Sequence, residues 1–231
     1  MPEPDSNVTL AIEAAGPSAS VAVGRGHAMQ HLEPVANAAR HDDDLMPAIV
    51  RSFARIAASP KDLGTVLVSV GPGGFTGLRI AVSTVKMLAL ALNCRIVSVY
   101  ETDAMIQAAP SANTPLAVCL TGKHGQYWTA FQHRGTAFPG QLLAIADVIH
   151  TAASEAITSI AVSQPPEHLA DLAAAATAAG LHLIEVHPNA SHVWQVGCRM
   201  VAAGRYTAAE QLLPIYPREP EAVRMWRQRK G

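Results

Sequence analysis

This chain of 231 residues has little charge, few aromatic residues and few cysteines. Charged residues make up 15% of it and aromatic residues 5%, whereas 49% of the chain is hydrophobic. This composition excludes a disordered protein and predicts apolar surface that a partner would cover. The formal net charge of −1 argues against nucleic-acid binding by the chain alone, because such binding normally requires a basic surface.

The cysteines and the chain start carry no sign of an oxidising compartment or a membrane. Cys94, Cys119 and Cys198 lie far apart, with neither metal-ligand spacing nor an even number for pairing. Residues 1–7 are polar and acidic and do not resemble a signal peptide, and we expect no apolar run of membrane-spanning length. These features predict a cytoplasmic protein with reduced cysteines and no membrane partner.

Residues 71–79, Gly-Pro-Gly-Gly-Phe-Thr-Gly-Leu-Arg, are the most informative segment of the chain. They follow the apolar run 65–70, whose β-branched residues are typical of a strand buried on both faces in a parallel sheet. The apolar segment 78–92 comes next and ends before Asn93. The sequence therefore predicts a strand, a tight glycine turn and a helix in direct succession.

The common phosphate-binding motifs do not fit this turn. A Walker loop ends in Gly-Lys-Ser/Thr, but here Gly77 is followed by Leu78 and Arg79. Pro72 occupies the variable position of a dinucleotide fingerprint, and no acidic residue closes a following strand. An anion at the helix N-terminus stays an alternative, but a close-packed corner is favoured. In that interpretation four glycines are structural: Gly71, Gly73, Gly74 and Gly77.

The remaining hydrophobic patterns predict an α/β protein. In its first part we expect strands at 8–13, 20–24, 28–32, 65–70 and 95–99, and helices at about 42–58 and 78–92. Asp42, Asp43 and Asp44 would supply carboxylates for the start of the first helix. Three meandering strands followed by helix, strand, helix and strand form the order of an actin-like half-domain. After a polar boundary near 108–114, a smaller unit is expected, with strands at 116–120, 126–133, 159–163 and 181–186 and helices near 167–179 and 193–203.

The glycine-rich segment, together with Ile80 and Lys86, resembles the signature of the TsaB (YeaZ) family. Further matching segments are Arg40-His41 before Leu45-Met46-Pro47, then Pro188-Asn189-Ala190, Leu213-Pro214-Ile215-Tyr216-Pro217-Arg218 and Pro220-Glu221-Ala222. The resemblance thus spans nearly the whole chain. It implies an actin-like (ASKHA, ribonuclease H-like) α/β fold of two lobes, each with a mixed sheet flanked by helices. Residues 1–108 would form the N-terminal lobe and 109–231 a smaller, degenerate C-terminal lobe.

The same resemblance implies a non-catalytic scaffold subunit rather than an enzyme. It would support TsaD in N6-threonylcarbamoylation of the adenosine next to the anticodon of tRNA. Its expected partners are a TsaD-type catalytic subunit, a TsaE-type ATPase and tRNA through the complex, with a homodimer as the alternative state of the free protein. No cofactor of its own is expected, and a nucleotide at the partner interface is left open. The alternative function is a stand-alone actin-fold small-molecule kinase or ATPase.

Departures from the resembled pattern weaken that alternative. An actin-like ATPase needs an acidic residue on its first strand and hydroxyls or glycines in the next turn. Where the family has a weakened Asp-Thr-Ser, this chain has Glu13-Ala14-Ala15. We therefore expect Glu13 to be a strand-end carboxylate and not a magnesium ligand. In the glycine-rich segment, this chain has Gly74 where the family usually has serine. In the second lobe, it has Thr121-Gly122-Lys123 where the family has an acidic turn.

The histidines do not predict a metal site. His27 and His31 have the spacing of helical metal ligands but fall on a predicted strand, where four residues span roughly 13 Å. His187 and His192 flank Pro188 and are expected in a solvated loop. We also find no Gly-x-Ser-x-Gly elbow and no cysteine nucleophile beside a histidine, so a peptidase receives no support.

Two segments are candidates for contacts with other molecules. The helix at 78–92 is apolar almost all round, so a second surface should cover it. By resemblance, it and the helix at 44–57 would pair with partner helices through Leu45, Ala48, Ile49, Ser52, Arg79, Ser83 and Lys86. We place Ala48 and Ser52 on the outer face of their helix, with Ile49 able to serve the core instead. The tail 224–230 mixes basic residues with Trp226 and could touch tRNA, although a solvated terminus is favoured.

Overall fold

The structure, a computed structural model, describes residues 7–36, 44–110, 114–121, 125–133, 136–137 and 140–217. Several sequence predictions lie outside these ranges. They concern Arg40 to Asp43, Gly122 to His124, Arg218, the Pro220-Glu221-Ala222 motif and the basic tail at 224–230.

The first lobe is built on a five-stranded mixed sheet with strand order β3-β2-β1-β4-β5. The strands are β1 (Val8–Glu13), β2 (Ser20–Arg25), β3 (Ala28–Pro34), β4 (Leu63–Ser69) and β5 (Arg95–Val99). β1, β4 and β5 run parallel, whereas β1, β2 and β3 form an antiparallel meander. The carboxyl ends of the three parallel strands therefore meet at one edge of the sheet, where sites in open α/β sheets usually lie.

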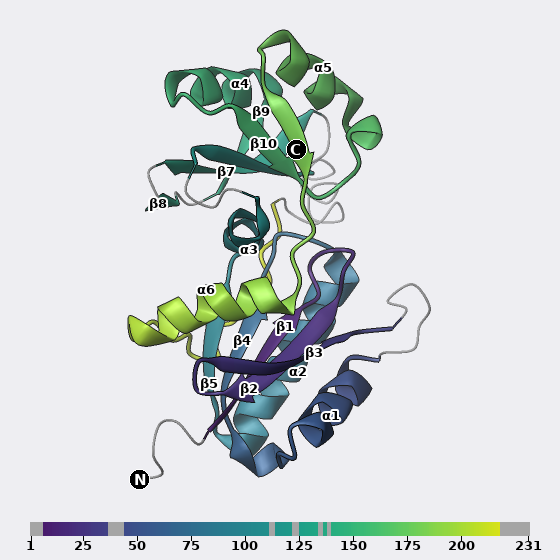
Figure 1. Cartoon of the computed structure of the whole chain (residues 1–231), viewed down its shortest axis with the longest axis vertical. Coiled ribbons are helices and arrows are strands. Elements are labelled where there is room, and N and C mark those ends of the chain that lie inside the picture. Colours follow the sequence, from purple (N-terminus) through teal and green to yellow (C-terminus); the bar gives the residue numbers. More distant parts are fainter. Residues whose placement is uncertain are drawn as a thin grey trace, which may run out of the picture.

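Helices cover both faces of this sheet (Figure 1). α1 (Leu45–Arg55) and α2 (Phe75–Leu92) pack on one face, and α6 (Ala190–Ala202) packs on the other. Leu10 and Ile12 point into the core beneath α1 and α2, while Ala11 between them packs beneath Trp194 of α6. This alternation explains the continuous apolar run of β1, because both faces of the strand are buried.

The second lobe has a sheet of order β11-β10-β6-β7-β8, with β9 also paired to β7. Its strands are β6 (Leu116–Thr121), β7 (Gln126–His133), β8 (Thr136–Ala137), β9 (Gln141–Ala144), β10 (Ser159–Val162) and β11 (His182–Glu185). α4 (Ile145–Ser154) and α5 (Ala170–Ala178) cover one face, and α3 (Glu101–Ala108) covers the other. Short 3₁₀ helices lie at Pro60–Asp62 and Pro166–Leu169. α3 also contacts α6, so it lies between the lobes (Figure 1).

The two-lobed α/β architecture confirms the predicted fold class, but the predicted second lobe needs correction. The chain crosses into that lobe through α3, whose Met105 and Ile106 pack on the second sheet. It then returns, because α6 packs on the first sheet and Leu212 is buried in the core beneath α1 and α2. Residues 190–217 therefore belong to the first lobe and not to a lobe of residues 109–231. α3 and α4 were not anticipated from the sequence.

Helix α2 combines unusual length with an unusually apolar surface. It is the one described helix long and apolar enough to cross a membrane by length and composition, with a mean hydropathy of 1.5 over 18 residues. The prediction that no apolar run reaches that length is therefore wrong for α2. Leu78, Ala81, Val82 and Val85 pack into the first lobe, yet only 22% of the helix is buried. Ile80, Leu88, Ala89 and Leu92 are partly buried against the same core, whereas Phe75, Met87 and Leu90 are exposed in the described chain.

Candidate functional site

The glycine segment forms a sharp corner between β4 and α2 that closes on the turn after β1. Gly71 has a φ of +94° and precedes a cis peptide bond to Pro72. The backbone N–H of Gly74 donates a hydrogen bond to the carbonyl of Ala15 at 2.7 Å. An added Cβ at Gly73 would overlap that same carbonyl oxygen, and one at Gly77 would overlap the carbonyl oxygen of Ala14. These two glycines therefore permit the close approach of two backbones.

The four glycines predicted to be structural do not share one role. At Gly71 the left-handed φ itself disfavours a side chain, and a Cβ would also lie 2.8 Å from Leu78 Cδ1. At Gly74 a Cβ would meet only the Ala15 oxygen at 3.5 Å, which is ordinary contact. Gly74 is thus the one position of the four where a larger residue fits. Because the Gly74 N–H is already bonded to Ala15, this corner offers an anion fewer free donors than a phosphate loop does.

A cleft of about 510 Å³ lies beside this corner, between the lobes. Its walls come from the turn after β1, the glycine corner, the ends of β6 and β10, and the C-terminal segment. The lining residues are Ala15, Gly16, Pro17, Pro72, Gly73, Gly74, Leu120, Ser163, Gln164 and Pro217. None of these side chains is charged, so the cleft wall itself supplies few groups for acid–base chemistry or metal binding.

Two carboxylic acids lie buried behind the cleft wall, at the carboxyl ends of the parallel strands. Glu13 ends β1, Ser69 ends β4, and Glu101 follows β5 as the first residue of α3. Glu13 Oε1 accepts hydrogen bonds from the N–H groups of Ala15 at 2.6 Å and Gly16 at 3.0 Å. Glu101 Oε2 accepts a hydrogen bond from Ser69 Oγ at 2.8 Å. Glu13 is therefore a strand-end carboxylate, as predicted, and it fixes the turn that closes on the glycine corner.

The pKa values of both acids are raised. Burial raises the pKa of Glu13, although the neighbouring Glu101 carboxyl group, the N–H groups of Gly16 and Ala15, and the nearby Ser69 hydroxyl oppose that rise. Burial also raises the pKa of Glu101 well above its usual value, and the neighbouring Glu13 raises it further. Sequence reasoning missed Glu101. Its signal was available, because an acidic residue just past a parallel strand lies at the edge where neighbouring strands also end.

Four residues predicted at a partner interface are instead buried within the chain. Leu45, Ala48, Ile49 and Ser52 are at most 5% exposed and face the first sheet from α1. The placement of Ala48 and Ser52 on the outer face is wrong, because positions 45, 48, 49 and 52 share one helical face. The Ser52 hydroxyl has no hydrogen-bond partner among the described residues.

The three predicted interface residues of α2 have different surroundings. Ser83 is exposed, and Lys86 is half-buried. Arg79 is exposed and stacks its guanidinium 3.6 Å from the ring centre of Phe75. Its Nε donates a hydrogen bond to Tyr216 Oη at 3.1 Å, and the rings of Phe75 and Tyr216 are 5.3 Å apart. Arg79 thus joins the start of α2 to the C-terminal segment, which the sequence did not reveal.

The exposed apolar residues of α1 and α2 lie on the sides that face away from the sheet. In α2, Leu90 is 80% exposed, Met87 63% and Phe75 50%. In α1, Val50 is 60% exposed and Met46 40%. Both helices cover the same face of the first sheet (Figure 1), and we refer to these five exposed residues together as the helical face.

The histidines lie in separate places. His31 is on β3 and contacts Glu33 at 3.1 Å, and His27 lies in the turn before that strand. His187 is exposed and bonds Glu185, whereas His192 is half-buried in the first turn of α6 and accepts the Asn189 N–H. The prediction of a solvated loop is therefore wrong for His192. Within the described ranges, no three His, Cys, Asp or Glu side chains cluster as metal ligands.

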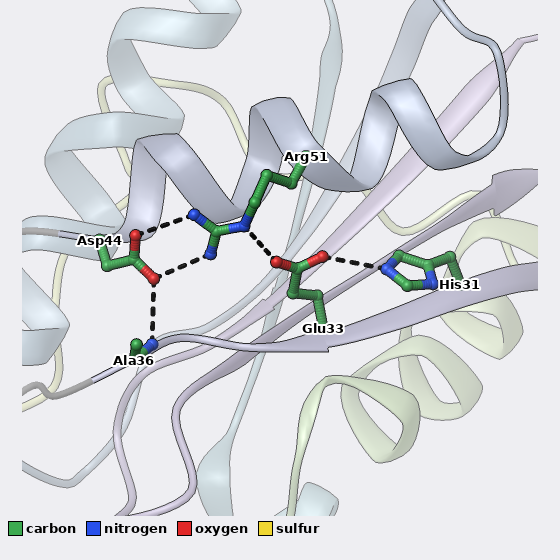
Figure 2. Close-up of polar contacts among 5 residues, drawn as sticks. All are labelled: His31, Glu33, Ala36, Asp44 and Arg51. Carbon is green, nitrogen blue, oxygen red and sulfur yellow. Dashed lines mark hydrogen bonds and ion pairs between the residues drawn. The ribbon is translucent and has the colours of Figure 1, made fainter.

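A surface network connects β3 to the start of α1. Figure 2 shows Arg51 between Glu33 on β3 and Asp44 before α1. Arg51 forms two hydrogen bonds to Asp44, at 3.1 and 2.9 Å, and Asp44 also accepts the Ala36 N–H. The hydrogen bonds from Arg51 lower the pKa of both carboxyl groups. Asp44 is the N-cap residue of α1, but its carboxylate makes no capping hydrogen bond, contrary to the expectation for this acidic cluster.

Comparison with known proteins identifies relatives along nearly the whole chain. Residues 32–215 match the family described as "TsaD: tRNA N6-adenosine threonylcarbamoyltransferase". The Escherichia coli tRNA threonylcarbamoyladenosine biosynthesis protein TsaB is 25% identical, covering 96% of this chain and 98% of that protein. An uncharacterized Mycobacterium tuberculosis protein is 27% identical over 69% of this chain and 81% of its own length. The structure of YeaZ from Pseudomonas aeruginosa superposes with a TM-score of 0.71 at 20% identity, covering 91% of this chain and 99% of that one.

Proposed function

Because the chain belongs to the TsaD family and matches its TsaB/YeaZ members over nearly its whole length, we propose that it acts in tRNA threonylcarbamoyladenosine biosynthesis. Its role there is that of a non-catalytic scaffold subunit. It binds a TsaD-type catalytic subunit, which modifies the adenosine next to the anticodon. A TsaE-type ATPase and tRNA join through the complex, and any nucleotide lies at the interface between subunits rather than in a site of this chain alone.

The described lining of the inter-lobe cleft supports a non-catalytic role, because none of its side chains is charged. In an actin-like enzyme the turn after the first strand contributes hydroxyls or glycines toward phosphate and metal. Here Ala14 and Ala15 provide only carbonyls, which pack against Gly77 and Gly73. The Glu13 carboxyl group is fully buried and bonded to its own turn, so it is not positioned to hold a hydrated magnesium ion.

The observation that carries the scaffold role is the uncovered helical face. A soluble protein rarely leaves several large apolar side chains exposed together unless a partner covers them. Leu90 and Met87 on α2 and Val50 on α1 would form the apolar centre of such a contact. Exposed Ser83 and Arg79 would lie toward its polar rim. Exposed apolar residues on two helices suit a partner that also presents helices.

A binding experiment with the TsaD-type protein of the same genome tests this assignment. In isothermal titration calorimetry, Leu90→Arg should weaken binding at least about tenfold, since burial of a charge in an apolar centre costs more than about 1.4 kcal/mol. Leu213→Arg is the matched control, because Leu213 is 64% exposed but lies outside α1 and α2. Circular dichroism should show both variants folded. Equal affinity of wild type and Leu90→Arg would reject the helical face as the binding surface.

The alternative of a stand-alone kinase or ATPase has its own test. We expect the isolated chain to show no steady ATP turnover with magnesium. Turnover by the wild type that is lost in Glu13→Gln would favour the enzyme over the scaffold. That assay does not depend on the partner, so its result is independent of the calorimetry.

A further inference from the structure

The buried carboxyl pair lies where three parts of the fold meet. Glu13 holds the turn at Ala15 and Gly16, which in turn closes on the glycine corner. Glu101 begins α3, the helix between the lobes, and its backbone N–H donates to the Gly71 carbonyl at 2.8 Å. The pair therefore connects the cleft wall, the glycine corner and the inter-lobe helix.

Two oxygens of this pair lack a donor. Glu13 Oε1 and Glu101 Oε2 receive the hydrogen bonds described above, whereas Glu13 Oε2 and Glu101 Oε1 have no partner among the described residues. Glu13 is 0% exposed and Glu101 is 1% exposed, so bulk water does not solvate these oxygens. A buried acceptor without a donor is costly. The two carboxyl groups lie against the same residue, because a Cβ added at Gly16 would meet Glu101 Oε1 at 3.4 Å and Glu13 Oε1 at 3.9 Å. A proton held between them would supply the missing donor.

The surroundings provide no positive charge to replace that proton. β1 contributes only Glu13 itself to this site. The turn that follows β1 contributes only the N–H groups of Ala15 and Gly16. From β4 it faces the neutral Ser69 hydroxyl, and from α3 Glu101. Asp103, also on α3, interacts with Arg199 and Arg205 instead. No arginine, lysine or histidine of the described chain acts on either Glu13 or Glu101.

We infer that Glu13 and Glu101 form a proton-dependent latch, in which one shared proton holds the cleft wall, the glycine corner and the start of α3 together. When that proton leaves, two negative charges occupy the same dry space, and like charges at such short range repel strongly. The latch then releases Ala15 and Gly16 on one side and Glu101 on the other. Alkaline pH thus loosens the junction between the lobes.

The direction in which stability changes with pH follows from the direction of the pKa changes. Both acids have a raised pKa in the folded state, so the folded chain keeps a proton that the unfolded chain loses near pH 4.5. The stabilising effect is complete below that pH and is lost as the pH rises toward the pKa of the pair. Across this window the unfolding constant should rise about tenfold per pH unit for one retained proton.

Urea unfolding between pH 4 and 9 tests the latch, with Glu101→Gln and Glu13→Gln as probes. Glutamine has the shape of a protonated glutamic acid and carries no charge. The slope of the unfolding free energy against pH reports how many more protons the folded state binds than the unfolded state, and this number should fall by about one in each variant. Each variant should also be more stable than the wild type at pH 8. Glu33→Gln is the matched control, because Glu33 is a surface acid bonded to Arg51, and it should keep the slope due to the pair. A Glu101→Gln slope equal to that of the wild type would overturn the latch.

Hydrogen exchange in the wild type gives a second measurement that requires no variant. The N–H groups of Ala15, Gly16 and Glu101 bond within the latch, so their protection should fall with rising pH beyond the intrinsic increase of exchange. The N–H of Val186, bonded to Val162 in the second lobe, serves as the internal reference. Equal pH dependence at the latch and at Val186 would also overturn the inference.

Discussion

Replacing Gly77 by alanine tests whether the glycine corner depends on close backbone approach. Gly77 lies in the first turn of α2, where alanine would ordinarily favour the helix by about 1 kcal/mol over glycine. A Cβ at this position would, however, overlap the Ala14 carbonyl oxygen, well inside the 3.0 Å that real Cβ contacts essentially never reach. The carbonyl oxygen belongs to the backbone, and the position of a Cβ is fixed by the backbone, so neither atom can move aside as the end of a flexible side chain would.

The relative sizes of these effects decide whether Gly77→Ala stabilises or destabilises the chain. Overpacking costs about 1–3 kcal/mol. Displacement of the turn at residues 14–15 would also weaken the adjacent hydrogen bond from Gly74 to Ala15, which contributes about 1 kcal/mol. After the helix gain is subtracted, Gly77→Ala should destabilise the chain by about 1–3 kcal/mol. The melting temperature should fall by about 2–4 °C per kcal/mol for a protein of this size.

Gly74→Ala is the matched control for this experiment. It lies three residues earlier, has a φ of −59°, and its added methyl group would meet the Ala15 oxygen at an ordinary 3.5 Å. We expect it to be neutral or to raise stability by a few tenths of a kcal/mol, because alanine restricts the unfolded chain. Thermal unfolding followed by circular dichroism measures both variants. Equal stability of Gly77→Ala and Gly74→Ala would refute the argument from close approach.

Three further predictions concern single side chains. Ser52→Ala should raise the free energy of unfolding by roughly 1 kcal/mol in urea titration, because it removes a buried hydroxyl without a partner; a loss of stability would contradict this. Arg51→Met should lower the melting temperature at pH 7, and this loss should shrink as the pH falls below 4.5 and 3.8, the ordinary pKa values of Glu33 and Asp44, since their lowered pKa values give stability that acid removes; a loss that does not change with pH would argue against the network. Cys119 should resist alkylation of the native protein, because burial raises its pKa to about 12, and rapid labelling detected by mass spectrometry would show an opened second lobe.

The sequence determined most of the local elements and the nature of the corner. The uninterrupted apolar stretch of β4 predicted a strand with both faces buried, and α6 covers the face that α1 and α2 do not. The glycines at 71–77 predicted a tight passage from strand to helix, and the apolar circumference of α2 predicted surface left for another molecule. These features depend on residues close together in the chain, so the local pattern contains them.

Tertiary structure alone decided which residues meet across the fold. The helical pattern of α1 gave an apolar stripe, but only packing on β2 and β3 showed that Ala48 and Ser52 extend this buried stripe. The return of residues 190–217 to the first lobe depends on contacts with strands more than a hundred residues earlier. The pairing of Glu13 with Glu101 likewise requires β1, β4 and β5 to be parallel neighbours. Burial of both acids at that shared edge, and hence their raised pKa values, arises from the strand order and not from either local sequence.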